Sequence, residues 1–136
     1  MGHMVPFEGE ASHKNREEYQ SILGSEMYLC TQTRPDIAFA MLILSRFLQN
    51  PSPQHIVAAK RVLRYLAGTK FIVIVYGRPT SNSDATSLLL HGYSDSNHGL
   101  DHEKRLSTSA YLAGGPISWS AKRQNALALS TTDAEY

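Results

Sequence analysis

The sequence predicts an α+β fold, in which a three-helix segment is followed by an antiparallel sheet of three or four strands and the start of another helix. Up to about residue 67, apolar residues recur at the three- and four-residue spacing that buries one face of a helix. After residue 70 the spacing changes to two, which is typical of strands. Clusters of glycine, proline and serine between the later segments indicate turns.

Two helices are expected between residues 16 and 50. The first covers 16–31, where Gly24 weakens the helix by up to about 1 kcal/mol relative to alanine and could bend it. The second begins at Pro35, a residue suited to a first helical turn, and its apolar face runs to Asn50. Residues 1–15 precede these helices as a vector-like remnant and an arm that we expect to be mobile. The apolar face of the first helix contains Tyr19, Ile22, Leu23, Met27 and Cys30.

The third helix is expected from Pro53 to Ala67, and Gly68 is a residue type that ends helices. A turn of about 100° per residue separates its side chains into two arcs. The apolar arc contains Ile56, Ala59, Val62, Leu63 and Leu66, and the adjacent arc contains Lys60, Arg61 and Arg64. These cations could contact nucleic-acid phosphates, or they could form a solvated helix face. Sequence alone leaves both interpretations open.

Strand patterns dominate the second half. Residues 71–76 are apolar and β-branched, and a polar loop over 77–87 follows. Further strands are expected at 88–95, 106–113 and 117–121, the last two joined by the hairpin signal Gly114-Gly115-Pro116. Residues 126–129 are another strand candidate. Ser130, Thr131 and Thr132 are N-cap candidates for a helix that includes Asp133 and Glu135.

Composition limits the function classes. The 136 residues carry a formal net charge of +1, so any contact with nucleic acid must depend on local patches. Cys30 is the single cysteine, which excludes an intramolecular disulfide and a cysteine-rich zinc site. A reducing, intracellular location in cytoplasm or nucleus is therefore expected. No apolar run approaches the ~18 residues that span a bilayer, so we expect no membrane partner.

Four stretches together resemble the Pol polyproteins of copia-type LTR retrotransposons. They are Tyr19–Ser25 (YQSILGS), Thr33–Ala40 (TRPDIAFA), Ala58–Thr69 (AAKRVLRYLAGT) and Gly92–Tyr136, which holds GYSDSNHG, RLSTSAYL, GGPISWSAKRQ and ALSTTDAEY in the family's order. The resemblance covers residues 16–136. It implies that 16–70 belong to the thumb and connection end of a reverse transcriptase. It also implies that 71–136 are the first part of an RNase H-like domain.

This resemblance implies a metal site and a reaction. Asp95, in YSD, corresponds to the first catalytic carboxylate of the RNase H fold, and Glu135, in AEY, corresponds to the second. The implied cofactor is Mg²⁺ or Mn²⁺, since cleavage of the RNA strand uses two metal ions held by hard oxygen ligands. The family's later catalytic carboxylates are absent from the sequence, so we expect little or no nuclease activity from the chain alone. The chain also has His98 where the family often has Trp, and Asp133 where it usually has Glu.

Other interpretations of these residues remain open. Lys104, Arg105, Lys122 and Arg123 could contact an RNA–DNA hybrid or another nucleic acid. A zinc cluster of Asp95, His98, Asp101 and His102 fits no standard spacing, and a polar loop explains those residues better. Trp119 could stack on bases, but we expect it to pack in a core.

The main alternative function is a non-catalytic module, retained by a host for binding protein or nucleic acid. An incomplete sheet leaves an edge and an apolar face uncovered, so a homodimer or another protein partner is also expected.

Overall fold

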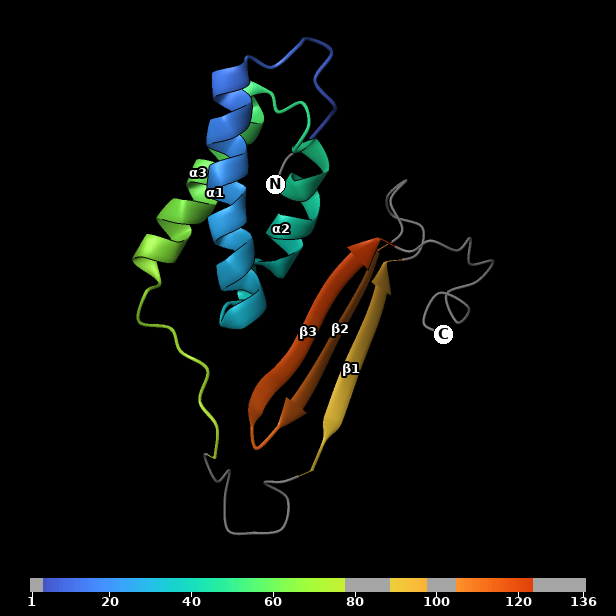
Figure 1. The fold of residues 1–136 in the computed structure, drawn as a ribbon. Coiled ribbons are helices and arrows are strands. Elements are labelled where there is room, and N and C mark those ends of the chain that lie inside the picture. Colours follow the sequence, from blue (N-terminus) through green and yellow to red (C-terminus); the bar gives the residue numbers. More distant parts are fainter. Residues whose placement is uncertain (1–3, 78–88, 98–104, 124–136) are drawn as a thin grey trace, which may run out of the picture. The chain divides into compact units, whose positions relative to one another are not determined.

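The computed structural model describes residues 4–77, 89–97 and 105–123, and divides the chain into two compact units, Met1–Ile72 and Val73–Tyr136. Helices form the first unit, and a three-stranded antiparallel sheet lies in the second, which confirms the predicted α+β class (Figure 1). The elements are α1 (His13–Gln32), η1 (Pro35–Ile37), α2 (Ala38–Leu44), η2 (Ser45–Phe47), α3 (Pro53–Gly68), β1 (His91–Asn97), β2 (Arg105–Leu112) and β3 (Gly115–Arg123).

Helix α1 begins three residues before its predicted start. The hydroxyl of Ser12 accepts a hydrogen bond from the backbone N–H of Asn15 at 3.3 Å, which satisfies one of the unpaired donors of the first turn. The helix continues through Gly24 to Gln32. The segment before α1 is joined to the loop before α3 by the amide of Asn50, which accepts from Ala11 N–H and donates to the carbonyls of Phe7 and Gly9.

The predicted second helix is wrong in one respect, because it is short and flanked by turns of 3₁₀ helix. Only Ala38–Leu44 is α-helical, with η1 before it and η2 after it. At the second junction the hydroxyl of Ser45 donates to the carbonyl of Leu42 at 3.1 Å. Such local side-chain bonds bend helices and favour the tighter 3₁₀ geometry at their ends.

Helix α3 extends one residue beyond its predicted end, to Gly68. Its start is a capping box with histidine in the place usually taken by glutamate. The Ser52 hydroxyl accepts from the His55 N–H at 3.2 Å, and His55 Nδ1 accepts from the Ser52 N–H at 3.0 Å. The His55 ring stacks on Phe47 at 3.8 Å between centroids. Burial of the imidazole lowers the pKa of His55, while a hydrogen bond with the Val5 backbone acts in the opposite direction.

The core of the first unit lies between α1, α2 and α3. Tyr19 is fully buried and its hydroxyl donates to the carbonyl of Leu44 at 2.7 Å, which joins α1 to the end of α2. Met27 and Leu63 were expected in this core but are 37% and 39% exposed. The buried residues of the core are Tyr19, Leu23, Cys30, Ile37, Met41, Leu44, Phe47, Ile56, Ala58, Ala59, Val62 and Leu66.

Glu26 lies on the buried face of α1, where the periodicity had placed its neighbour Met27 instead. It follows Tyr19 by seven residues and Leu23 by three, so it faces the core with them. Its side chain is 0% exposed, and neither carboxylate oxygen has a hydrogen-bond partner among the residues that the structure describes. Burial raises the pKa of Glu26 to about 7. Burial, and then the nearby Glu26 carboxylate, raise the pKa of Tyr19.

Arg34 connects the turn after α1 to the end of α3. Its guanidinium donates to both carboxylate oxygens of Asp36, at 2.9 and 2.7 Å, and to the hydroxyl and carbonyl of Thr69, at 2.6 and 3.3 Å. Tyr65 donates to Asp36 at 2.8 Å, and its ring lies 5.5 Å from the guanidinium carbon of Arg34. Hydrogen bonding from Arg34 holds the pKa of the Asp36 carboxyl below its usual range. Arg34 is only 7% exposed, so these contacts replace most of its water.

The sheet has the order β1-β2-β3, and both pairs are antiparallel. The predicted hairpin is present, but its turn lies at Ala113-Gly114 and Gly115-Pro116 already belong to β3. Both turn residues have positive φ, 51° and 80°, as a tight two-residue hairpin requires. The expected strand at 71–76 is wrong, since that stretch pairs in no ladder of the described residues. The candidates at 126–129 and 130–135 lie outside the described residues.

Replacing Arg34 with lysine should destabilise the first unit by about 2 kcal/mol, because one ammonium group cannot reproduce the forked contacts to Asp36 and Thr69. Urea unfolding followed by helical circular dichroism measures this change. Arg64→Lys is the control, since Arg64 is exposed and its change should stay within about 0.5 kcal/mol. Equal stability of the two variants would contradict the proposed importance of the Arg34 contacts.

Glu26 should make the first unit less stable as pH rises. The unfolded side chain ionises near pH 4.5, whereas the folded one stays protonated to about pH 7. The free energy of unfolding therefore falls across that window, by about 3 kcal/mol.

Glu26→Met should remove this loss, so its stability advantage over the parent chain should grow between pH 4.5 and pH 7 and then level off. Urea titrations at several pH values give that difference directly, because His55 contributes equally to both proteins. The exposed Glu10→Met is the control. A pH-independent difference between Glu26→Met and the parent would disprove the burial of a neutral carboxyl.

Candidate metal and nucleic-acid sites

Asp95 is the fifth of the seven residues of β1 and lies opposite Ser107 of β2. Its side chain is exposed, and no described residue forms a hydrogen bond or ion pair with it. An exposed carboxylate on a paired strand has a fixed backbone and free oxygen atoms, which suits a hard divalent cation. The structure thus confirms the strand location of Asp95, while its role as a metal ligand stays a prediction.

Glu135, the second predicted ligand, lies outside the described residues, as do His98, Asp101, His102 and Lys104. Within residues 4–77, 89–97 and 105–123, no three carboxylate, imidazole or thiol side chains are grouped to hold a metal ion. Asp95 is therefore the part of the predicted metal site whose location is known.

Aromatic rings surround the start of β1. The His91 ring is stacked with Tyr111 of β2 at 6.0 Å between centroids, and Tyr93 meets Tyr111 edge to face at 5.7 Å. Tyr93 is 65% exposed and precedes Asp95 by two residues, so both side chains lie on the same face of the sheet. Trp119, which we expected in a core, is half-buried on β3.

The three predicted cations of α3 are all exposed, but they differ in their partners. Lys60 forms an ion pair with Glu18 of α1. Arg64 donates weakly to the carbonyl of Lys60, at 3.4 Å, and neither Arg61 nor Arg64 pairs with a carboxylate among the described residues. Arg61 and Arg64 are consequently better placed than Lys60 to meet a phosphate group.

The predicted cations of the sheet lie near one end of the β2–β3 ladder. The backbones of Arg105 and Arg123 are directly opposed, and Lys122 is opposite Leu106. Arg105 also pairs with Asn97, two positions from Asp95 along β1. Lys122 is exposed. The register therefore brings two of these basic positions near the end of the strand that carries Asp95.

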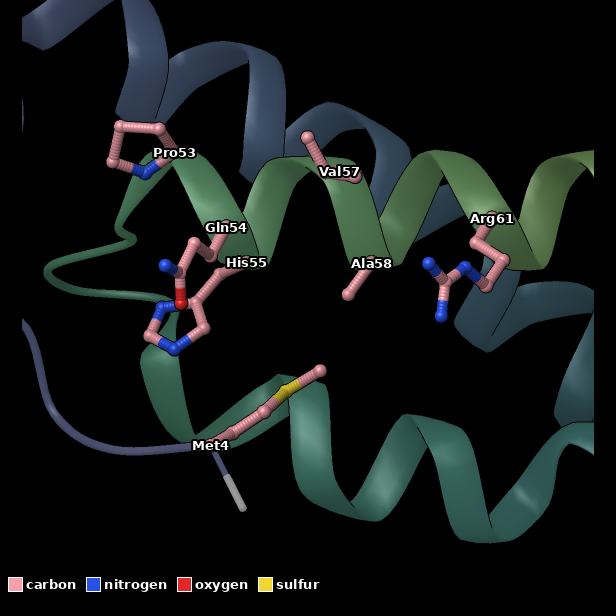
Figure 2. A pocket seen from close by; sticks show the side chains of 7 residues that line it. All are labelled: Met4, Pro53, Gln54, His55, Val57, Ala58 and Arg61. Atoms are coloured by element: carbon pink, nitrogen blue, oxygen red, sulfur yellow. The ribbon is translucent and has the colours of Figure 1, made fainter. Parts of the chain in front are cut away.

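An open pocket of about 400 Å³ lies along the first turns of α3 and was not predicted from the sequence. Figure 2 shows Gln54 and His55 at one end, Arg61 at the other, and Met4 across from Ala58. Arg61 is the only ordinarily charged side chain of its lining, since the pKa of His55 is lowered by burial. The pocket lacks an acid–base pair, so it gives no reason to assign catalysis there.

No helix among the described residues is long and apolar enough to cross a membrane. The chain matches no protein-family model, and the comparison with solved structures found no match.

Curated proteins, in contrast, match most of the chain. It is 43% identical over 130 residues to the retrovirus-related Pol polyprotein from transposon TNT 1-94 of Nicotiana tabacum, a match that covers 93% of this chain and 9% of the polyprotein. It is 37% identical over 135 residues to the putative transposon Ty5-1 protein YCL074W of Saccharomyces cerevisiae, covering 96% of this chain and 42% of that protein.

A third relative is close to this chain in length. The secreted RxLR effector protein 161 of Plasmopara viticola is 45% identical over 121 residues, which cover 87% of this chain and 81% of the effector. The chain spans less than half the length of the transposon proteins that it matches. The identities across nearly the whole chain show that it belongs to the family of retrotransposon Pol polyprotein sequences.

Proposed function

We propose that this chain is a piece of a copia-type reverse transcriptase and RNase H, which in complete form cleaves the RNA strand of RNA–DNA hybrids. The observation that carries the proposal is Asp95 in its GYSD motif on β1, the first of three consecutive antiparallel strands. The relatives support the retrotransposon origin. In this proposal the helical unit corresponds to the thumb and connection end of the polymerase.

Asp95 and Glu135 would hold Mg²⁺ or Mn²⁺, and the metal would activate water and stabilise the leaving oxygen. Asp95 fits this role because its carboxylate is exposed and has no described partner to displace. Two carboxylates give a weak site, since Mg²⁺ loses its bound waters reluctantly and gains little from so few charged ligands. Further ligands from elsewhere are needed for efficient cleavage, so the isolated chain is expected to be a poor nuclease.

The basic residues would contact phosphate groups of the hybrid. Arg61 and Arg64 on α3, and Lys122 on β3, are exposed cations that can release counterions from the phosphate backbone. Lys60 contributes less, because binding a phosphate would compete with its ion pair to Glu18. Lys104, Arg105 and Arg123 remain proposed contacts. The proposed setting is intracellular, in cytoplasm or nucleus.

A second candidate is a non-catalytic binding module, and the match to the effector favours it. That relative is a short protein of which this sequence covers 81%, so the same stretch occurs outside a long polyprotein. Its name contains RxLR, and this chain has an Arg-x-Leu-Arg string at Arg61–Arg64 of α3, but Val62 of that string is 5% exposed and packs in the core. A partner would therefore meet Arg61 and Arg64 on a folded helix rather than an extended peptide.

Asp95→Asn should weaken Mn²⁺ binding at least tenfold and abolish whatever metal-dependent cleavage of a labelled RNA–DNA hybrid the chain shows, because the amide carries no charge. Calorimetric Mn²⁺ titration and gel-resolved cleavage in Mg²⁺ and Mn²⁺ measure the two effects. Glu135→Gln should act in the same direction, whereas Glu10→Gln should change neither. Undiminished Mn²⁺ binding by Asp95→Asn would refute the metal assignment and favour the non-catalytic module.

Arg64→Gln should lower hybrid affinity and reduce the slope of log K against log salt by about one, as expected for one lost phosphate contact. Lys60→Gln should have a smaller effect because of Glu18. Fluorescence anisotropy with a labelled hybrid gives both values, with Lys14→Gln on α1 as the charge-matched control. If all three variants lose affinity equally, α3 is not a specific contact surface.

A further inference from the structure

The segment Phe71–Tyr76, with the sequence FIVIVY, follows α3 and is drawn as a plain trace (Figure 1). Its six residues are β-branched or aromatic, and the first charged residues on either side are Lys70 and Arg78. Short uncharged segments of high β-propensity, without proline or glycine, are the sequences that pair most readily with identical strands. Folded proteins usually bury such a segment in a sheet.

Most of these side chains are exposed. Phe71 is 83% exposed, Val73 70% and Val75 55%, and these three alternate positions would share one side of a strand. Ile72 and Tyr76 are 57% and 52% exposed. Exposed apolar surface of this kind is unfavourable in water and becomes favourable when another chain covers it.

The backbone of the segment is also largely unpaired. The N–H groups of Val73, Ile74 and Val75 donate to no other described residue. At the far end, the Tyr76 hydroxyl donates to the Pro116 carbonyl at 2.6 Å, and Gly77 N–H donates to the Ala113 carbonyl at 2.8 Å. The segment is therefore anchored to the β2–β3 turn, while the N–H groups of its middle are unpaired within the described part of the chain, like those of an edge strand.

We propose that Phe71–Tyr76 is a strand-addition surface through which two copies of this chain pair. A second copy is the partner that fits best, because the segment has no charge for another protein to complement and its identical side chains can interdigitate with themselves. Its exposed side chains amount to roughly 500 Å² per copy, given about 150–250 Å² for a whole aromatic side chain.

Two copies would bury on the order of 1,000 Å², the lower limit for a specific interface, so the association is weak and reversible.

The cations at the ends of the segment make pairing sensitive to salt. Pairing in either direction brings Lys70 and Arg78 of one copy near the same charges of the other. Lys70 is exposed, with its ammonium 5.1 Å from the centre of the Phe71 ring. Salt screens this repulsion, so higher ionic strength should strengthen the association.

Sedimentation velocity of the full chain over a wide concentration range tests the proposal. The parent should shift from monomer to dimer with concentration, and more readily at high salt. Val73→Lys should raise the dissociation constant at least tenfold, because two buried ammonium groups would face each other. Val57→Lys, at a 52% exposed valine of α3, is the matched control and should dimerise like the parent. Thermal melting shows that both variants fold.

Amide hydrogen exchange provides a second measurement at the segment itself. Exchange at residues 73–75 should slow as the parent dimerises and should remain fast in Val73→Lys. A chain that stays monomeric at all concentrations would overturn the proposal. So would a dimer that survives Val73→Lys, or one that Val57→Lys weakens equally.

Discussion

The contacts of Arg34 are the constraint on which the helical unit most depends. Its guanidinium binds Asp36 in the turn after α1 and also Thr69, 35 positions after Arg34 and just beyond the end of α3. Helix α2 begins immediately after that turn, so the direction of its chain is set there. A buried forked donor that lost its acceptors would cost several kcal/mol, which gives this turn one favoured geometry. The relative positions in which α1, α2 and α3 pack around their core then depend on the geometry of this turn.

Two buried titratable groups lower the stability of the helical unit, one as pH rises and the other as pH falls. Glu26 has no hydrogen-bond partner in the described part of the chain, and burial raises its pKa, so it destabilises the unit as pH rises through the range between 4.5 and about 7. His55 accepts from Ser52 as a neutral ring and has a lowered pKa, so its contribution is lost as pH falls below its ordinary value of 6.5. A variant that lacks Glu26 should therefore lose stability only toward low pH, through His55, whereas the parent chain also loses stability toward pH 7.

Sequence reasoning succeeded where a local signal decides the structure. Helix α3 was predicted to within one residue because Pro53 and Gly68 are residue types found where helices begin and end. The alternation around Asp95 predicted a strand, although β1 begins three residues later than expected.

It failed where distant contacts decide. Periodicity cannot assign a carboxylate to a core, so Glu26 was missed. Nothing local connects Arg34 with Thr69, and positive φ at Ala113 moved the hairpin turn by one to two residues. For FIVIVY, the β-branched and aromatic composition indicated a high strand propensity, but a strand also requires a paired neighbour.

The candidate site was predicted mainly through the resemblance to Pol polyproteins. An isolated Asp95 would have been interpreted as a turn or cap residue, and only its motif indicated a metal ligand. The structure adds that its carboxylate is exposed on a paired strand, beside Ser107 and two residues from Tyr93. It adds also that Lys60 is engaged by Glu18, which no sequence pattern indicated.

The most direct test of the account is a titration of the ¹⁵N-labelled chain with Mn²⁺, monitored by paramagnetic broadening of the amide signals. Binding at Asp95 predicts that signals of β1 near Asp95 and of β2 near Ser107 broaden first, ahead of those at the Ala113-Gly114 turn of the same sheet, and that Asp95→Asn removes the effect. Broadening that begins elsewhere, or that persists in Asp95→Asn, would contradict the assignment of Asp95 as the metal ligand of an RNase H site.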